Sequence, residues 1–241
     1  MRKDTFFKNS FFLTASNITT GILGFIFSMY LGNIAGPEGL AVYGLVMPVY
    51  NLFICLMTAG IIAAISQRSA IYESTEEYNN LFKTINTVAF FNIIWSIIIG
   101  ILVFFLAPYI SKYGIKDPRT LNAIRVTCPA MVFIALSNIL KGFFYGTSRI
   151  TVPAIIDISE KAMRIITITL LIFIFKAQTL SSIVTLAFVS LAIGELQSLL
   201  LLYAYFKYTK RHMPLGHDIP ERKAQLLFNV LIVSLPLCIN G

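Results

Sequence analysis

Four charged residues lie inside an otherwise apolar stretch, where they occupy about two helical turns. Asp157, Glu160, Lys161 and Arg164 belong to a predicted helix over residues 151–175. Only 11 residues follow the last of these charges before the helix is expected to end, which is about 16 Å of helix, whereas the hydrocarbon core of a bilayer is about 30 Å thick. Part of the charged turn must therefore lie at membrane depth, where ionisable residues usually face a bundle interior or a watery cavity and mark the path of a substrate or ion.

The spacing of these charges indicates how they could be tolerated. At about 100° per residue, the four positions fall within one arc of about 100° on the helix, with isoleucines on the opposite face. The sequence predicts two ion pairs within the helix, Asp157 with Lys161 and Glu160 with Arg164, because each acid precedes its base by four residues. An interfacial first turn whose charges extend into the headgroups is the alternative interpretation, and Arg164 is the residue that it explains least well.

The next predicted helix, over residues 180–206, carries a second charge inside an apolar run. Glu195 lies 12 residues before Lys207, and Arg164 lies 11 residues after Pro153. If the two helices are antiparallel neighbours, Glu195 and Arg164 lie at similar depth. We therefore expect these two side chains to approach each other across the bundle.

The preceding helix, predicted over residues 121–146, adds two basic residues and a glycine motif. Lys141 near one end and Arg125 near the other are interpreted first as boundary residues whose charged ends reach the interface, and second as members of the charged site. Gly142 and Gly146 form a G-x-x-x-G motif, which allows close approach of two helices.

The elements that position these residues are membrane helices. The chain has 241 residues, of which 57% are hydrophobic and 12% are charged, about half the charged share of an ordinary soluble domain. Residues 9–37, 39–67 and 84–111 are uncharged over 29, 29 and 28 residues, and each block exceeds the roughly 20 residues that a spanning helix needs. The composition excludes a soluble enzyme, a nucleic-acid-binding domain and a secreted disulfide scaffold.

We predict an all-α, polytopic membrane bundle with six complete transmembrane helices and the start of a seventh. The predicted spans are 10–31, 40–66, 84–107, 121–146, 151–175 and 180–206, followed by an apolar run from residue 225. With the N-terminus inside, the inner loops hold twelve Lys and Arg residues and the outer loops hold five. By the positive-inside rule, this bias predicts a cytoplasmic N-terminus.

No motif indicates catalysis or a cofactor. The sequence has no G-x-S-x-G, H-E-x-x-H or phosphate-binding loop. The loop residues His212 and His217 are interpreted as solvated side chains, so no metal site is expected. The net charge of +8 is attributed to membrane topology, and no nucleic-acid partner is expected.

Seven short strings together resemble the SpoVB-type polysaccharide biosynthesis and sporulation proteins, in the superfamily that includes MurJ-type lipid II flippases, Wzx-type O-antigen flippases and MATE exporters. They are LGF at 23–25, GPEGLAVYG at 36–44, AIS at 64–66, LKGFFYG at 140–146, the charged turn at 157–165, GEL at 194–196 and SLP at 234–236.

The resemblance implies a two-lobe transporter in a bacterial cytoplasmic membrane. Residues 1–224 are expected to form the N-terminal six-helix lobe and residues 225–241 the truncated start of the seventh helix, so the C-terminal lobe is a missing partner. Membrane lipid and an undecaprenyl-linked oligosaccharide diphosphate, as in spore cortex peptidoglycan synthesis, are the other implied partners. Where MurJ-type flippases place arginines on the first helix, this sequence has Gly21 and Phe27, so a diphosphate site must use other cations.

Three functional hypotheses follow. The first is a flippase of lipid-linked cell-wall precursor that works by alternating access. The second is a cation-coupled, MATE-like exporter in which acids exchange protons for drug, and the third is a membrane scaffold whose internal charges only pack helices. The candidate substrate and cavity residues are Asp157, Glu160, Lys161, Arg164, Glu195, Lys141 and Arg125.

Overall fold

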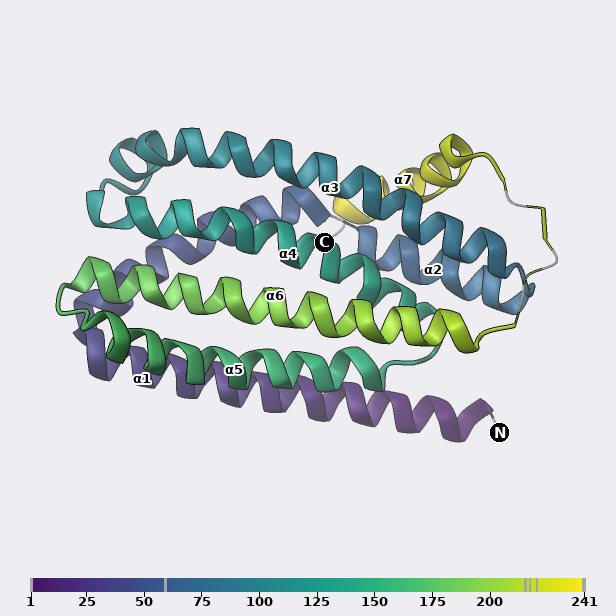
Figure 1. The fold of residues 1–241 in the computed structure, drawn as a ribbon, viewed down its shortest axis with the longest axis horizontal. Coiled ribbons are helices and arrows are strands. Elements are labelled where there is room, and N and C mark those ends of the chain that lie inside the picture. The colour runs from purple at the N-terminus through teal and green to yellow at the C-terminus, as the bar shows by residue number, and fades with distance from the viewer. Residues whose placement is uncertain (1, 59, 215, 217, 220, 240–241) are drawn as a thin grey trace.

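The structure is a computed structural model of the chain, and it shows an elongated bundle of helices aligned with the long axis of the molecule (Figure 1). It describes residues 2–58, 60–214, 216, 218–219 and 221–239, with the side chains of residues 2–6, 8 and 235–239 excepted. Within this described part every regular element is helical. The predicted all-α bundle is therefore confirmed as a fold class.

The first long helix is bent back on itself. α1 covers Arg2–Thr58 but contains Gly36 with φ 71° and ψ 178°, a left-handed φ that favours glycine. Pro37 follows, a residue well suited to starting the next helical stretch. The two halves of α1 run in opposite directions along the bundle (Figure 1), as expected for the predicted spans 10–31 and 40–66.

The predicted second span is interrupted before its expected end at residue 66. Gly60 has φ 69°, and a separate helix, α2, covers Ile61–Ser74. A Cβ atom on Gly60 would lie 2.3 Å from the backbone carbonyl oxygen of Ser234. The break at Gly60 therefore lets a later helix approach this backbone closely, a tertiary requirement that hydropathy does not reveal.

The remaining helices follow the predicted order, with two longer than expected. α3 covers Tyr78–Tyr109 and continues into a π-helical turn at Ile110–Ile115, and a 3₁₀ turn at Pro118–Thr120 precedes α4 at Leu121–Gly146. α5 covers Thr151–Phe175, α6 covers Leu180–His212 and α7 covers Lys223–Ile239. The bounds predicted for α4 and α5 are exact, whereas the predicted loops 67–83 and 207–223 are partly helical.

The basic end of α6 and the acidic cap of α3 explain these longer helices. Lys210, Arg211 and His212 occupy the last turn of α6, where cations complement the helix dipole. At the start of α3, the Asp218 carboxylate accepts hydrogen bonds from the backbone N–H groups of Asn79 (3.0 Å) and Asn80 (2.8 Å). The α6–α7 loop is thereby attached to α3, although His217 itself lies outside the described residues.

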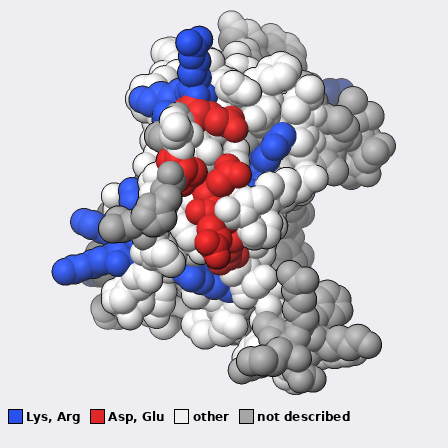
Figure 2. Space-filling view, turned by 90° about the vertical axis from the view of Figure 1, so that its right-hand side faces the viewer, with Lys and Arg blue, Asp and Glu red and all other residues white. Residues whose placement is uncertain are grey.

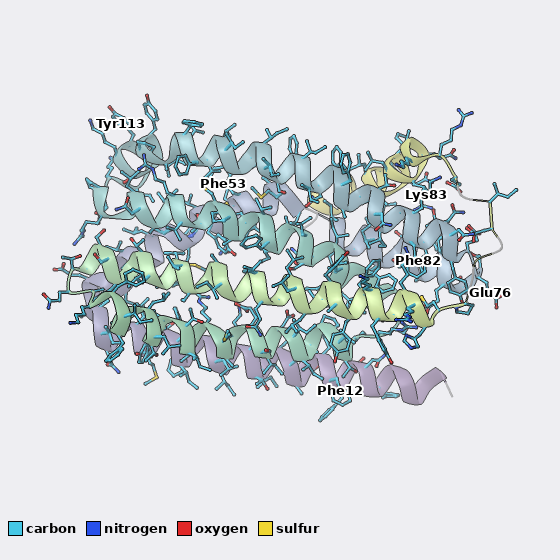
Figure 3. The ribbon with its side chains drawn as sticks, in the orientation of Figure 1. Phe12, Phe53, Glu76, Phe82, Lys83 and Tyr113 are labelled. Carbon is cyan, nitrogen blue, oxygen red and sulfur yellow. The ribbon has the colours of Figure 1, made fainter. Side chains whose placement is uncertain are left out.

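This end of the bundle carries many of the surface charges. Figure 2 shows acidic side chains gathered across the face that lies at the right in Figure 1, with Lys and Arg residues around them. Glu76 lies at this end, and Phe12 projects from the flank of α1 (Figure 3). Charges at the end and large apolar side chains along the flanks are typical of a membrane bundle.

Among the residues that the structure describes, four helical segments are long and apolar enough to cross a membrane: Asn9–Ser74, Tyr78–Ile115, Pro118–Gly146 and Leu180–His212. The first includes the reversal at Gly36, and α5 is excluded from this group by its charged turn. The chain is thus a multi-pass membrane protein, and the count of six complete spans remains a prediction.

The glycine motif of α4 packs against α2. A Cβ atom on Gly142 would lie 2.9 Å from the Ile62 carbonyl oxygen, and one on Gly146 would lie 2.3 Å from that of Ser66. Neither position has room for a side chain, which confirms the predicted close approach of two helices.

α7 packs on α2 and α3 rather than standing apart from them. Its residues Leu226 and Val230 are fully buried, and the Arg68 guanidinium donates a hydrogen bond to the Asn229 carbonyl oxygen at 3.3 Å. The division of the chain between residues 224 and 225 remains a prediction.

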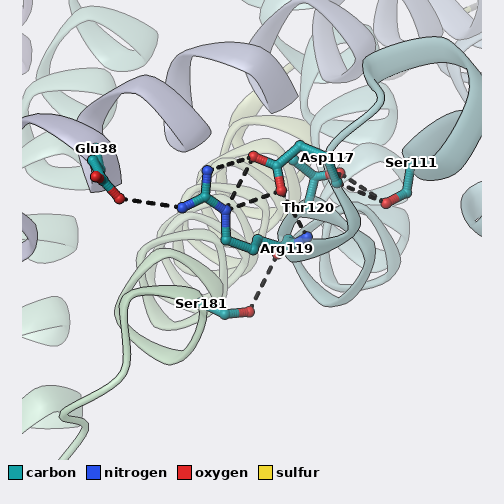
Figure 4. A network of polar contacts seen from close by, with 6 residues as sticks. All are labelled: Glu38, Ser111, Asp117, Arg119, Thr120 and Ser181. Carbon is teal, nitrogen blue, oxygen red and sulfur yellow. Dashed lines mark hydrogen bonds and ion pairs between the residues drawn. The ribbon is translucent and has the colours of Figure 1, made fainter.

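A polar network connects the elements at the opposite end of the bundle (Figure 4). The Arg119 guanidinium pairs with Asp117 at 2.8 Å and with Glu38, just after the Gly36 bend, at 3.3 Å. The Arg119 carbonyl oxygen accepts a hydrogen bond from Ser181 at the start of α6, at 3.2 Å. Hydrogen bonding to Arg119 holds the pKa of Asp117 below its usual range.

Candidate functional site

The charged face of α5 points into the bundle. α5 packs against α1 and α6, and Glu160 and Arg164 are only 4% and 7% exposed. On the opposite face, Ile155 and Ile166 are 60% and 56% exposed. The predicted orientation of the two faces is confirmed for these residues.

The ion pairs differ from those predicted within α5. Asp157 pairs across to Lys141 of α4, with 2.7 Å between Oδ1 and Nζ, and Glu160 pairs with its neighbour Lys161 at 2.7 Å between Oε2 and Nζ. The predicted pairs between residues four apart are therefore wrong. Packing of α4 beside this face offers Asp157 a cation from another helix, so its pairing is interhelical.

Arg164 is held by aromatic residues of α1. Its Nη2 donates a hydrogen bond to the Tyr43 hydroxyl, and its guanidinium carbon lies 4.1 Å from the centre of the Phe27 ring. The Tyr43 ring stacks on Phe188 of α6 with 4.9 Å between ring centres. Phe27 is one of the two residues that stand where the resemblance places arginines, and here it supports the arginine of α5.

Arg164 and Glu195 form no direct ion pair within 4.0 Å, although both side chains are described, and their expected approach across the bundle stays a prediction. The guanidinium instead points to the aromatic pair of α1, because the folding back of α1 at Gly36 brings Phe27 and Tyr43 to this depth. The spacing of charges on α5 and α6 carries no information about this contact with α1.

Glu160 and Glu195 lie at the contact of α5 and α6. Glu195 is 6% exposed and has no hydrogen bond or ion pair to any described residue. Glu160 lies against Gly194, because a Cβ atom there would be 3.1 Å from Glu160 Oε1. The glycine before Glu195 therefore makes the room that the Glu160 carboxylate occupies.

Tyr50 joins this group from the second half of α1. It is 4% exposed, and its hydroxyl is buried without a hydrogen-bond partner among the described residues. The hydroxyl lies within electrostatic range of the Glu195 and Glu160 carboxylates and of the Arg164 guanidinium. Sequence reasoning missed Tyr50, since a lone tyrosine in an apolar span carries no spacing signal.

Several polar atoms in this centre lack partners in the described structure. Glu160 Oε1, Arg164 Nε and the Tyr50 hydroxyl are all buried without a hydrogen bond. Buried polar groups are usually satisfied, so unpartnered ones indicate where water, an ion or a ligand binds. Glu160 and Arg164 are buried, whereas Asp157 and Lys161 are partly exposed, so the predicted wet chamber beside the four α5 charges stays a prediction.

We name the six residues brought together here the charged centre: Lys141, Asp157, Glu160, Lys161, Arg164 and Glu195. It contains three bases and three acids and is therefore neutral overall. Lys141 is joined to it through its pair with Asp157. Arg125, the seventh candidate, lies apart near the other end of α4, with its guanidinium 5.3 Å from the Phe104 ring.

Comparison with known proteins places this chain in a family. A family model described as polysaccharide biosynthesis protein matches residues 6–241. The chain is 28% identical over 238 residues to stage V sporulation protein B of Bacillus subtilis, covering 98% of this chain and 46% of that protein. It is 23% identical over 215 residues to the lipid II flippase MurJ of Bacillus subtilis, covering 84% of this chain and 39% of that one.

Solved structures share the fold at low identity. An outward-facing multidrug resistance MATE family transporter of the MOP superfamily matches with a TM-score of 0.74 and 19% identity, over 98% of this chain and 52% of that one. A MOP superfamily transporter from Pyrococcus furiosus matches with a TM-score of 0.72 and 20% identity, over 98% and 52%. The chain spans about half the length of these relatives. By its family match, it belongs to the polysaccharide biosynthesis protein family of multi-pass membrane proteins.

Proposed function

We propose that this chain forms one lobe of a transporter that moves a lipid-linked oligosaccharide diphosphate across the bacterial cytoplasmic membrane. The N-terminus lies in the cytoplasm, and a second lobe of similar size completes the protein. The two lobes rock about the substrate, so that the site opens to one side of the membrane at a time.

The observation that carries the proposal is the burial of the charged centre inside a membrane lobe. A charge near the bilayer centre costs at least about 2.5 kcal/mol, and such residues are kept chiefly where a polar solute, ion or proton passes. The acids and bases are not fully paired with each other, since Glu195 forms no ion pair within 4.0 Å with any described residue and one oxygen of Glu160 has no hydrogen bond among them. Interactions that served packing alone would leave fewer such atoms unsatisfied.

The cations of the charged centre are the groups that bind the diphosphate. Lys141 and Lys161 are partly exposed, with 15% and 32% of their side-chain surface accessible, and can reach a phosphate from their present positions. Arg164 offers its unpartnered Nε, and Tyr43 and Phe27 hold its guanidinium plane. The acids Asp157 and Glu160 keep the two lysines in place until phosphate replaces them.

A transport assay tests this assignment. Fluorescent lipid II is reconstituted in liposomes with the chain and its second lobe, and flipping is compared between the unmodified protein, Arg164→Ala and Arg164→Lys. We expect Arg164→Ala to slow flipping at least tenfold and Arg164→Lys to restore part of the rate. Lys112→Ala, outside the charged centre, is the control and keeps the full rate. Equal rates for all four proteins would remove Arg164 from the mechanism.

A second candidate function is a cation-coupled exporter of organic cations. The observation that favours it is Glu195, a buried carboxylate that forms no ion pair within 4.0 Å with any described residue. Drug resistance conferred on a sensitive host, and lost in Glu195→Gln but not in Arg164→Lys, would support this function over lipid flipping. The spore cortex as the destination of the substrate rests on the similarity to the sporulation relative alone.

A further inference from the structure

A second polar feature lies on the flank of the bundle, away from the charged centre. Two cavities of about 580 and 550 Å³ lie at the charged end of α3 and α6. They share Asn86 and Lys210 in their walls, and the second also includes Lys207 and Arg211. All three of these basic side chains are exposed.

A third cavity continues from these two along the bundle. It has a volume of about 330 Å³ and lies between α3, α4 and α6. Its walls include Asn86, Tyr203 and Phe206, which also line the second basic cavity. The rest of its lining is apolar: Ile85, Ala89, Ile93, Leu136, Ile139, Leu140, Leu199 and Leu200.

The apolar cavity opens on a surface that faces lipid in a membrane bundle. Ile93, Leu200 and Tyr203 at its walls are 36%, 59% and 57% exposed. Phe90 beside it on α3 is 68% exposed. Large apolar side chains exposed side by side are typical of a lipid-facing flank.

The basic residues above this cavity lack acidic partners. No described acid forms an ion pair with Lys207, Lys210 or Arg211. Lys210 instead lies over the Phe82 ring, with 5.2 Å from Nζ to the ring centre. Helix-end cations that served only the α6 dipole would need no apolar cavity beneath them.

We propose that this groove binds one anionic phospholipid of the adjacent leaflet. An acyl chain fills the cavity between α3, α4 and α6, and the phosphate lies between Lys207 and Lys210, with Arg211 at the rim. The volume matches the lower end of ordinary ligand sites, and basic residues at a membrane surface attract anionic lipid. The site is separate from the charged centre and does not depend on the proposed transport.

Native mass spectrometry of the chain in neutral detergent tests the proposal, with phosphatidylglycerol and phosphatidylcholine of equal chain length as probes. We expect the unmodified chain to bind phosphatidylglycerol at least tenfold more tightly. Lys207→Gln combined with Lys210→Gln should weaken the binding of phosphatidylglycerol about 30-fold, as expected for the loss of two basic residues near the surface. The double variant should also lose the preference for phosphatidylglycerol over phosphatidylcholine. Lys112→Gln with Lys116→Gln, the same charge change at the other end of α3, should leave it intact.

The apolar part of the site has its own test. Ala89→Trp should fill the cavity and weaken the binding of both lipids at least fivefold. Ile93→Trp at the rim provides a second variant if the first fails to fold. Equal binding of the two lipids, or unchanged binding in the tryptophan variants, would overturn the proposal. Displacement of phosphatidylglycerol by glycerol phosphate at equal concentration would show a headgroup site only and overturn it as well, as would a preference for undecaprenyl phosphate.

Discussion

The guanidinium of Arg164 on α5 rests 4.1 Å from the ring centre of Phe27 on α1. The contact joins two residues that are 137 positions apart, and it anchors the one arginine of the charged centre to the helix that folds back at Gly36. A cation and an aromatic face attract each other most strongly where water is excluded. The position of Arg164 is thus set by α1 rather than by the acids around it.

Replacing Phe27 should loosen this anchor. We expect Phe27→Ala to destabilise the bundle by about 3–5 kcal/mol, since it removes a buried aromatic side chain and its interaction with a desolvated cation. Phe25→Ala on the same helix is the matched control, because Phe25 is 65% exposed. Thermal unfolding in detergent, followed by circular dichroism, measures both. Equal midpoints for the two variants would contradict the role given to Phe27.

The pair of Lys141 and Asp157 should couple α4 to α5. Its 2.7 Å separation and partial exposure predict a coupling of about 1.5–3 kcal/mol, as for hydrogen bonds to charged groups. A double-mutant cycle of Lys141→Met and Asp157→Asn measures this coupling. The double variant should lose less stability than the sum of the losses in the two single variants. Additive effects would show that the pair contributes nothing beyond its separate members.

The α4 glycines should tolerate no side chain. Gly146→Val would place a methyl group against the α2 backbone, and overpacking of this kind costs about 1–3 kcal/mol or more. Gly24→Val is the control, because nothing lies within 4 Å of a Cβ atom there. Retention of stability in Gly146→Val, measured by detergent thermal shift, would mean that α2 and α4 can separate without cost.

The sequence predicted α4 and α5 to the residue because loops over residues 109–120 and 147–150 bound their apolar runs. It failed for the ends of α3 and α6. Polar residues such as Asn80 and Lys210 favour a loop by composition, but the Asp218 cap and the α6 dipole keep them helical.

The inward face of α5 was also predictable, since helical periodicity fixes which residues share a side. The partners of these residues were not. Which side chain meets Arg164 or Asp157 depends on how α1 folds back and on the register of α4, and both are properties of the tertiary structure.

Acid should loosen the network at the other end of the bundle. The pKa of Asp117 is lowered in the folded chain by Arg119, so its contribution to stability is present above the ordinary value of about 3.9 and is lost as the pH falls through the lower folded value. In Arg119→Gln the pKa of Asp117 should rise toward its ordinary value. Carbonyl NMR of labelled aspartate in a pH titration measures this shift, and an unchanged titration would contradict the assigned cause.

The central claim is that the charged centre exists for a solute rather than for packing. Buried ion pairs can often be replaced by apolar side chains of similar size without loss of stability, so fold and function can be separated here. The decisive measurement is lipid II flipping by a variant with Lys141→Met, Asp157→Leu, Glu160→Met, Lys161→Met and Arg164→Met, which replaces both ion pairs whole, reconstituted with the second lobe and checked for native helix content. We predict that flipping falls to the rate of protein-free liposomes while the bundle stays folded. Flipping at the unmodified rate would contradict the claim and leave the charges with a purely structural role.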